Sequence, residues 1–316
     1  MDWDVFNGDA DGVCSLIQLR LEDPRPNAML VTGVKRDIKL LKRVTADAGD
    51  RVTVLDISLA KNRDELERVL GAGAEVLYAD HHDPGERFGH ERLDQHIVTK
   101  GEMCTAAIVD NLLDGAQRDW AVVGAFGDNM NAMAERLAEG RGLPLEAIRE
   151  LGNLINYNGY GASLEDLHYH PDALYKLMLA HGSPLSALEG DEIAVLREGF
   201  QSDRAAAEDA DVVFQNEAAL AVVLPDGAPS RRIGGVWGNI LASANPDRAH
   251  AILTDRGGVF TVSIRAPINT RRGAVDLANQ FETGGGRAAA AGINDLPESD
   301  LDRFLKAFDA AFPVVA

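Results

Sequence analysis

Residues 76–82 read Val-Leu-Tyr-Ala-Asp-His-His, a short apolar run that ends on one acidic residue and two histidines. A run of about four to six apolar residues has the length of a buried parallel strand. Adjacent histidines after an acidic residue have little structural purpose at the end of such a strand. The stretch therefore predicts a strand over Val76–Ala79 that presents Asp80, His81 and His82 as functional side chains.

Three other apolar runs end in the same way. They are Trp3–Phe6 before Asn7-Gly8-Asp9-Ala10-Asp11-Gly12, Val52–Leu55 before Asp56, and Ala121–Phe126 before Gly127-Asp128-Asn129. Ligands of open α/β sheets collect at the carboxyl ends of the strands. The four strand ends therefore predict one site at which acidic and histidine side chains converge.

Amphipathic segments alternate with these runs in the first half of the chain, which predicts helices between the strands of a largely parallel sheet. Helices are predicted over Val13–Leu21, Ile38–Thr45 and Asn62–Leu70, and a further strand over Ala28–Thr32. From Cys104 to about Leu196 the pattern is mostly helical. This helical stretch includes Trp120–Phe126, so the fourth apolar run also fits a helix.

The second half begins with a predicted linker helix over Glu189–Ala210, with Ile193, Leu196 and Phe200 at helical spacing. Strands follow over Val212–Phe214, Ala218–Leu224, Ala251–Leu253 and Val259–Ile264, and helices over Ala274–Phe281 and Asp300–Phe308. A chain of 316 residues exceeds the usual size of a single core. We therefore expect a two-lobed α/β protein, with domains over 1–189 and 212–316 joined by a linker helix over 190–211.

The net charge of −19 limits which molecules the chain can bind. Residues 212–316 hold 10 basic and 11 acidic side chains, so the N-terminal part carries about −18 of the total. Long duplex nucleic acid is bound through phosphate neutralisation, which an acidic surface opposes. We expect a small anionic substrate held in a cleft between an acidic metal-binding lobe and a neutral lobe that carries arginines.

The sequence contains no apolar run of the length of a membrane span, and its first residues lack the pattern of a signal peptide. The two cysteines, Cys14 and Cys104, lie in helix-like segments and fit a reducing compartment. We expect a cytoplasmic protein that does not associate with membranes.

Carboxylate and imidazole ligands suit Mn²⁺ or Mg²⁺, whereas structural zinc sites usually include cysteine. Two such ions about 3.5–4 Å apart clamp the attacking and leaving oxygens of a phosphoryl group and activate water near neutral pH. The predicted chemistry is hydrolysis of a phosphoester, with one or two ions per chain.

The four elements, in this order, resemble the motifs of the DHH phosphoesterase superfamily, which is named for the Asp-His-His triplet. The C-terminal part resembles the DHH-associated substrate domain, in which a glycine-rich turn opens an alanine-rich helix. The motifs that carry this second resemblance are Ser263-Ile264-Arg265, Val275-Asp276-Leu277-Ala278 and Gly284-Gly285-Gly286-Arg287-Ala288-Ala289-Ala290-Ala291-Gly292. The length and layout are most similar to nanoRNases and nucleotide phosphatases; RecJ-type exonucleases share the motifs but are usually larger.

The resemblance implies roles for particular residues. The implied metal ligands are Asp9, Asp11, Asp56, His81 and Asp128. Asp56 would bridge the ions, and Asp56, His81 and His82 would form the catalytic group, with His82 facing the substrate phosphate. Arg265 would make a bidentate contact with a phosphate, through two guanidinium N–H groups. Gly284, Gly285 and Gly286 would hold a phosphate on backbone N–H groups at a helix N-terminus.

Two positions depart from the pattern of the superfamily. Many members carry a histidine four residues before the first aspartate of the opening motif, where this chain has Val5. Asn7 or water would fill that gap as a weak ligand, so the first metal site is expected to be weak or altered. The glycine-rich motif usually ends in histidine, where this chain has Arg287. Arginine binds phosphate strongly, which favours a substrate with an additional or terminal phosphate.

The leading hypothesis is a metal-dependent hydrolase of phosphodiester or phosphomonoester bonds in short oligonucleotides, dinucleotides or phosphorylated nucleotides. One alternative is a nucleotide- or phosphate-binding regulatory protein that kept the scaffold with altered or lost activity. Another is an exonuclease acting on longer single strands. The chain could form a homodimer. Weaker candidates for a metal or substrate contact are His168 and His170, and the Arg231-Arg232 pair is expected to be solvated.

Overall fold

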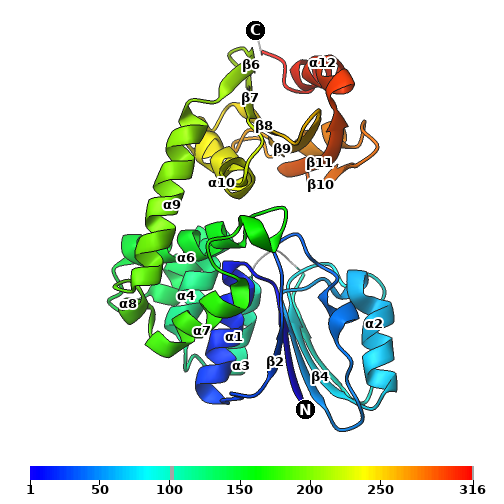
Figure 1. Cartoon of the computed structure of the whole chain (residues 1–316), viewed down its shortest axis with the longest axis vertical. Helices are drawn as coiled ribbons and strands as arrows, with labels where there is room; N and C mark the ends of the chain where they lie inside the picture. The colour runs from blue at the N-terminus through cyan, green and yellow to red at the C-terminus, as the bar shows by residue number, and fades with distance from the viewer. Residues whose placement is uncertain (100–102, 315–316) are drawn as a thin grey trace. The chain divides into compact units, whose positions relative to one another are not determined.

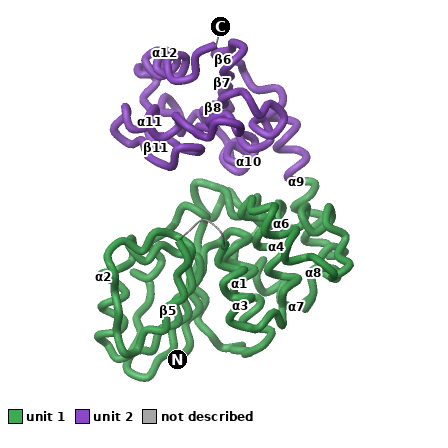
Figure 2. Tube along the Cα trace, turned by 180° about the vertical axis from the view of Figure 1, so that it is seen from behind, with its two compact units in different colours: residues 1–198 green, residues 199–316 purple. Residues whose placement is uncertain are grey.

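The computed structural model describes residues 1–99 and 103–314 (Figure 1). Within them the chain forms two compact units, residues 1–198 and residues 199–316 (Figure 2). The division falls inside α9 (Asp191–Glu208), which lies within the predicted helix Glu189–Ala210. The domain ranges 1–189, 190–211 and 212–316, and a cleft between the lobes, remain predictions.

The first unit is built on a five-stranded sheet in the order β2-β1-β3-β4-β5, and every neighbouring pair is parallel. The strands are β1 (Asp2–Phe6), β2 (Met29–Val31), β3 (Arg51–Leu55), β4 (Glu75–Asp80) and β5 (Leu93–Ile97). The predicted α/β fold with a parallel N-terminal sheet is confirmed. The strand β5 was not predicted, because this edge strand is largely exposed and has polar residues at its centre.

Helices cover both faces of this sheet (Figure 1). They are α1 (Ala10–Glu22), α2 (Leu59–Gly71), α3 (Thr105–Leu112), α4 (Arg118–Gly127), α5 (Asn131–Ala138), α6 (Leu145–Gly159), α7 (Pro171–His181) and α8 (Pro184–Ala187). The helix α2 lies on one face, and α1 lies on the other with the remaining helices beyond it. The predicted helix over Ile38–Thr45 is only a short 3₁₀ turn, Leu40–Arg43. Among the described residues, no helix is both long and apolar enough to cross a membrane.

The fourth apolar run, Ala121–Phe126, belongs to α4, so its prediction as a strand is wrong and its alternative prediction as a helix is right. Every residue from Trp120 to Gly127 is buried. A helix buried on all sides lacks a polar face, so periodicity alone cannot distinguish it from a buried strand. Close packing explains its glycines, because a methyl group at Gly127 would lie 2.3 Å from Cβ of Ala10.

The two faces of β1 serve different purposes. Val5 is fully buried in an apolar cluster that includes Val54 and Leu66. On the other face, Asp4 accepts hydrogen bonds from Nε and Nη2 of Arg20 at 2.8 and 2.6 Å. Where the superfamily often has histidine, this chain therefore has a core residue, which cannot act as a ligand.

The second unit is built on a six-stranded mixed sheet in the order β10-β11-β9-β8-β7-β6. The strands are β6 (Asp211–Gln215), β7 (Ala219–Leu224), β8 (Ala249–Asp255), β9 (Val259–Arg265), β10 (Gly284–Gly286) and β11 (Ala290–Pro297). Only the β7–β8 pair is parallel among the strands that the structure describes in this sheet. The helices are α10 (Ala228–Ala244), α11 (Ala274–Ala278) and α12 (Leu301–Ala311). Alternate residues of β8 pack in a core with α11 and α12, while α10 packs on the opposite face.

The glycine-rich motif does not open a helix, so this prediction is wrong. Gly284–Gly286 form β10, which pairs antiparallel with β11, and Ala290 and Ala291 belong to β11. Pairing of β11 with β9 overrides the helix propensity of the alanines. A methyl group at Gly284 would lie 1.8 Å from the carbonyl oxygen of Ala278, so close packing against the end of α11 requires glycine here.

Candidate metal centre

The turn from β1 into α1 positions Asp9 and Asp11. Asp9 is the N-cap of α1, and its Oδ1 accepts a hydrogen bond from the backbone N–H of Gly12 at 3.1 Å. A methyl group at Gly12 would lie 2.2 Å from the carbonyl oxygen of Asn7, so this tight turn requires glycine. Asn7 braces the turn, because its Oδ1 accepts from the backbone N–H of Asp9 at 3.2 Å.

Asp11 is buried in the first turn of α1. Its two carboxylate oxygens accept hydrogen bonds from the backbone N–H groups of Thr105 and Ala106, each at 2.7 Å, at the start of α3. Burial raises the pKa of Asp11 to about 6, and the negative charges of Asp128 and Asp9 add to this. A bound cation would relieve that electrostatic cost.

Asp56 follows β3 in a left-handed backbone conformation, with φ of 57°. A non-glycine residue is strained there by about 1–3 kcal/mol, and such strain is common at functional sites. The buried Oδ1 of Asp56 accepts a hydrogen bond from Oγ1 of Thr105 at 3.1 Å. Burial and the neighbouring carboxylates, Asp9 first among them, raise the pKa of Asp56 well above its ordinary value.

The histidines follow β4. Nε2 of His81 lies 3.5 Å from Asp56 Oδ1, 3.9 Å from Asp128 Oδ2 and 4.0 Å from Asp11 Oδ2. His82 makes its closest contact with Asp80 of the same triplet, with 2.7 Å between Nδ1 and Oδ1. Asp80 is fully buried, whereas the side chain of His82 is 47% exposed. His81 therefore faces the carboxylates, and His82 can reach a ligand from outside.

The structure brings four of the five predicted ligands together. Among the described residues, two groups of three have ligand atoms within 4.8 Å of one another: Asp11, His81 and Asp128, and Asp56, His81 and His82. Asp128 comes from the C-terminal cap of α4 rather than from a strand end. Asp9 belongs to neither group.

The donor set fits a divalent cation. A six-coordinate ion with ligands at about 2.1 Å separates adjacent donors by about 3 Å and opposite donors by about 4.2 Å. The distances of 3.5–4.0 Å from His81 to the three carboxylates fall within that range. Carboxylate oxygens with one or two imidazoles suit Mn²⁺ or Mg²⁺. The raised pKa values of Asp11 and Asp56 indicate negative charge that the protein leaves partly uncompensated.

Lys35 lies at the centre of the site and was not among the predicted site residues. Nζ of Lys35 lies 2.6 Å from Asp9 Oδ2 and 3.8 Å from Asp128 Oδ1. Although burial raises the pKa of Asp9, this ammonium outweighs burial and lowers the pKa below its ordinary value. Lys35 follows β2, so the rule used for the other strand ends could have found it.

The predicted substrate residues lie in the second unit. Arg265 ends β9, and its guanidinium donates to Oδ1 of Asn239 at 2.6 Å and to the carbonyl oxygen of Gly235 at 3.2 Å, both in α10. Arg287 is exposed at the turn between β10 and β11, next to Gly286. Substrate contacts of Arg265, Gly284, Gly285, Gly286 and Arg287 remain predictions.

The two weaker candidates, His168 and His170, make local structural contacts, and the prediction for Arg232 is wrong. His168 Nε2 lies 2.9 Å from the hydroxyl of Tyr157, and the ring of His170 caps α7. Arg232 is not solvated, because it forms two hydrogen bonds of 2.8 and 2.9 Å with the buried carboxylate of Asp203.

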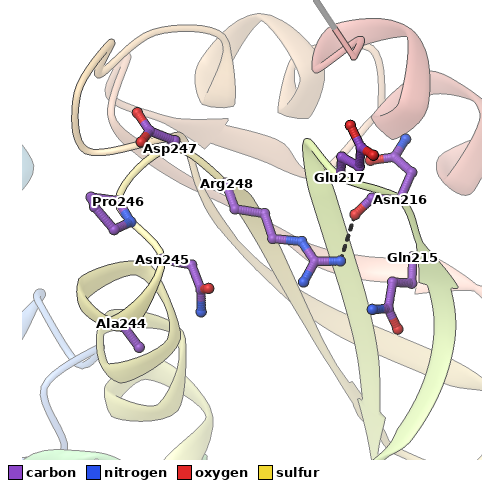
Figure 3. Close-up of a pocket in the computed structure, with 8 residues that line it drawn as sticks. All are labelled: Gln215, Asn216, Glu217, Ala244, Asn245, Pro246, Asp247 and Arg248. Atoms are coloured by element: carbon purple, nitrogen blue, oxygen red, sulfur yellow. Dashed lines mark hydrogen bonds between the residues drawn. The ribbon is translucent and has the colours of Figure 1, made fainter.

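A hollow of about 580 Å³ lies in the second unit beside the β6–β7 turn and the end of α10 (Figure 3). Arg248 crosses its floor and donates to the carbonyl oxygens of Asn216 and Ala219. These bonds join the start of β8 to the β6–β7 turn. None of the predicted substrate residues lines the hollow.

Comparison with known proteins defines the class of fold. No protein-family model and no curated protein matches the sequence. Solved structures do match, and they include a DHH domain, RecJ and a phosphodiesterase. The DHH domain from a member of a family of ribosomal proteins has a TM-score of 0.63 and 15% identity, with 98% of this chain and 85% of that chain covered. The chain therefore has the fold of DHH-domain proteins, as the motifs predicted.

Two enzymes are among the structural matches. Exonuclease RecJ bound to manganese has a TM-score of 0.60 and 19% identity, with 99% of this chain and 90% of RecJ covered. The pGpG-specific phosphodiesterase PggH from Vibrio cholerae has a TM-score of 0.56 and 16% identity, with 97% of each chain covered. RecJ from Thermus thermophilus has been solved with Mn²⁺ and with Mg²⁺.

Proposed function

We propose that this protein is a metal-dependent phosphoesterase that hydrolyses short oligonucleotides, dinucleotides or phosphorylated nucleotides. The observation that carries the proposal is the convergence of Asp11, Asp56 and Asp128 on Nε2 of His81. The fold shared with RecJ and with a pGpG-specific phosphodiesterase supports phosphoester chemistry. The ions bound to RecJ support Mn²⁺ or Mg²⁺ as cofactors.

Each residue has a defined task in this proposal. Asp11, Asp56, His81 and Asp128 would hold the ion, which supplies charge stabilisation and lowers the pKa of bound water. Asp80 fixes the ring of His82 through Nδ1, which leaves Nε2 for the substrate. Burial lowers the pKa of His82, but the hydrogen bond and charge of Asp80 outweigh burial and raise it. An imidazolium at this position donates a hydrogen bond to a phosphate oxygen and stabilises the developing charge.

The predicted substrate is small and anionic. An acidic chain with a net charge of −19 is poorly suited to long duplexes, for which phosphate neutralisation dominates affinity. Arg265 and Arg287 are proposed to contact terminal phosphates. The two cysteines of the chain are buried and not bonded to each other, which suits the reducing cytoplasm proposed as its location.

A substrate panel in the presence of Mn²⁺ tests the proposal. The panel contains dinucleotides, a length series of labelled single strands, and nucleotides with terminal phosphates. We expect phosphate or mononucleotide release from the short substrates, and a loss of about 10³-fold or more in Asp56→Asn. Asp64→Asn is the matched control, because Asp64 is an exposed aspartate of α2.

The same panel separates the alternatives. Nucleotide binding without turnover under any metal would favour a regulatory protein and would contradict the enzyme. Activity that rises with strand length would favour an exonuclease.

A further inference from the structure

Lys35 places a positive charge inside the acidic cluster. Its side chain is 25% exposed, and Nζ lies 2.6 Å from Asp9 Oδ2, 3.3 Å from Asn156 Oδ1 and 3.8 Å from Asp128 Oδ1. Three oxygen neighbours, two of them carboxylate, form the kind of surroundings that a bound cation takes. The ammonium thus lies where a second ion would have to compete for Asp9 and Asp128.

The backbone holds Lys35 at this position. Its N–H donates to the carbonyl oxygen of Gly159 at 2.8 Å, and its carbonyl oxygen accepts from Nδ2 of Asn7 at 3.3 Å. These two contacts connect the loop after β2 to the end of α6 and to the turn that carries Asp9. The backbone of Lys35 is therefore held from both sides of the site, which places its side chain beside Asp9.

The remaining donors suit one ion, because the two groups of ligand atoms, one with Asp11 and Asp128 and one with Asp56 and His82, share His81. Nε2 of His81 faces Asp11, Asp56 and Asp128. An imidazole nitrogen has one lone pair, so it binds one cation. Asp9 lies outside both groups of ligand atoms and is paired with Lys35 at 2.6 Å. Val5 is buried in the core and has no donor atom, so it adds no ion ligand beside Asp9, and one lone pair of Asn7 Oδ1 is used by the backbone N–H of Asp9.

We infer that the ammonium of Lys35 takes the place of one of the two divalent ions, so that the centre binds a single Mn²⁺ per chain. The fixed charge neutralises Asp9, and the ion occupies the group formed by Asp11, Asp56, His81 and Asp128. This inference rests on the proposed function for the existence of the metal centre, and it adds the number of ions and the residue that sets it.

Mn²⁺ titration of the full chain by calorimetry and electron paramagnetic resonance tests the inference. We expect one Mn²⁺ per chain in the wild type, with the spectrum of an isolated ion. Lys35→Met is expected to bind two ions with an exchange-coupled spectrum, and Lys35→Met combined with Asp9→Asn is expected to return to one. Lys35→Arg keeps the charge and should bind one ion. Lys61→Met, at an exposed lysine of α2, is the matched control and should also bind one.

If the wild type binds two Mn²⁺ per chain, the inference is overturned, whatever the variants bind. One ion in a Lys35→Met protein that still binds Mn²⁺, and is therefore folded, would also overturn it. The stoichiometry is independent of turnover: one bound ion without hydrolysis of any substrate would support this inference and count against the proposed function. A wild type that binds no Mn²⁺ would overturn both.

Discussion

Oδ1 of Asp80 lies 2.7 Å from Nδ1 of the His82 ring and stays outside the ligand group around His81. The same oxygen accepts a hydrogen bond from the backbone N–H of His81 at 2.9 Å. The three residues of the triplet thus have separate tasks. His81 faces the carboxylates, and His82 is proposed to contact the substrate. Asp80 holds the backbone of His81 and the ring of His82 through the same oxygen.

Asp80→Asn is expected to lower the pKa of His82, because the hydrogen bond and the carboxylate charge that favour the imidazolium are weakened or removed. The alkaline limb of the activity profile should move to lower pH together with this pKa. Ring resonances in a proton NMR titration of the metal-free protein measure the change, and His82→Gln assigns the signal. An unchanged His82 titration in Asp80→Asn would contradict the role assigned to Asp80.

Mn²⁺ affinity is expected to fall as the pH drops below about 6. The folded-state pKa of Asp11 is raised from 3.8 to about 6, so below that pH the ion must displace a proton. Each displaced proton weakens binding by about tenfold per pH unit. Dissociation constants from pH 5 to 8, measured by electron paramagnetic resonance, give the slope. Asp11→Asn should bind Mn²⁺ weakly, and its dissociation constant should change less with pH than that of the wild type. The exposed control Asp64→Asn should match the wild type in both respects.

The raised pKa of Asp11 also predicts how the stability of the metal-free protein depends on pH. Because the folded state holds the Asp11 proton more tightly than the unfolded state, this group's contribution to the unfolding free energy falls as the pH rises from about 3.8 to 6. Mn²⁺ should therefore raise the melting temperature more at pH 7.5 than at pH 5. Equal stabilisation at both values would count against burial of this carboxylate.

Gly284 and Gly285 are expected to respond differently to alanine. A methyl group at Gly284 would meet the carbonyl oxygen of Ala278 at 1.8 Å, whereas one at Gly285 meets no described atom within 4 Å. Gly284→Ala should lower the unfolding free energy by about 2 kcal/mol or more. Gly285→Ala should leave stability unchanged. Because the backbone of Gly285 is predicted to contact a substrate phosphate, the same variant should raise KM. Urea unfolding and steady-state kinetics separate the two effects, and an unchanged KM in Gly285→Ala would remove this segment from the substrate site.

The ion pair between Asp4 and Arg20 is expected to be costly to break. Both side chains are buried, and Nη2 of Arg20 also donates to Oγ1 of Thr53 at 2.9 Å. Arg20→Met leaves a buried carboxylate unpaired and should cost about 3–5 kcal/mol, while Asp4→Leu combined with Arg20→Met should cost less. Arg51→Met, which removes an ion pair with Asp2 on the surface, should change stability far less, because water screens exposed ion pairs. Urea unfolding measures all three, and equal costs for the single variants would refute the argument.

Much of the first unit could be predicted because its strands are short, apolar and end on polar residues. Val76–Ala79 and Val52–Leu55 lie within observed strands, and the residues after them gather as expected. The apolar run Ala121–Phe126 was ambiguous because a fully buried helix and a buried strand have the same composition. Asp128 nevertheless reaches the site, because α4 ends where the strands do.

Two features of the structure depend on how strands pair and were not predicted. Ala290 and Ala291 have strong helix propensity, yet pairing with β9 places them in a strand. Lys35 stands alone in an unremarkable loop, and only the parallel pairing of β2 with β1 brings it to the acidic edge of the sheet. Long-range pairing decided the strand at Ala290 and Ala291, whereas the strand-end rule, applied to the predicted strand Ala28–Thr32, could have pointed to Lys35.

The close packing of α4 has a consequence for how the protein opens. Asp128 depends on this helix, whereas His81 and Asp56 depend on the sheet, so detachment of α4 would divide the ligand group. A ligand that binds only the intact group opposes such local unfolding by mass action. Amide protons of Trp120–Gly127 should therefore exchange with solvent more slowly once Mn²⁺ is present, and α4 would report occupancy of the centre through its protection from exchange.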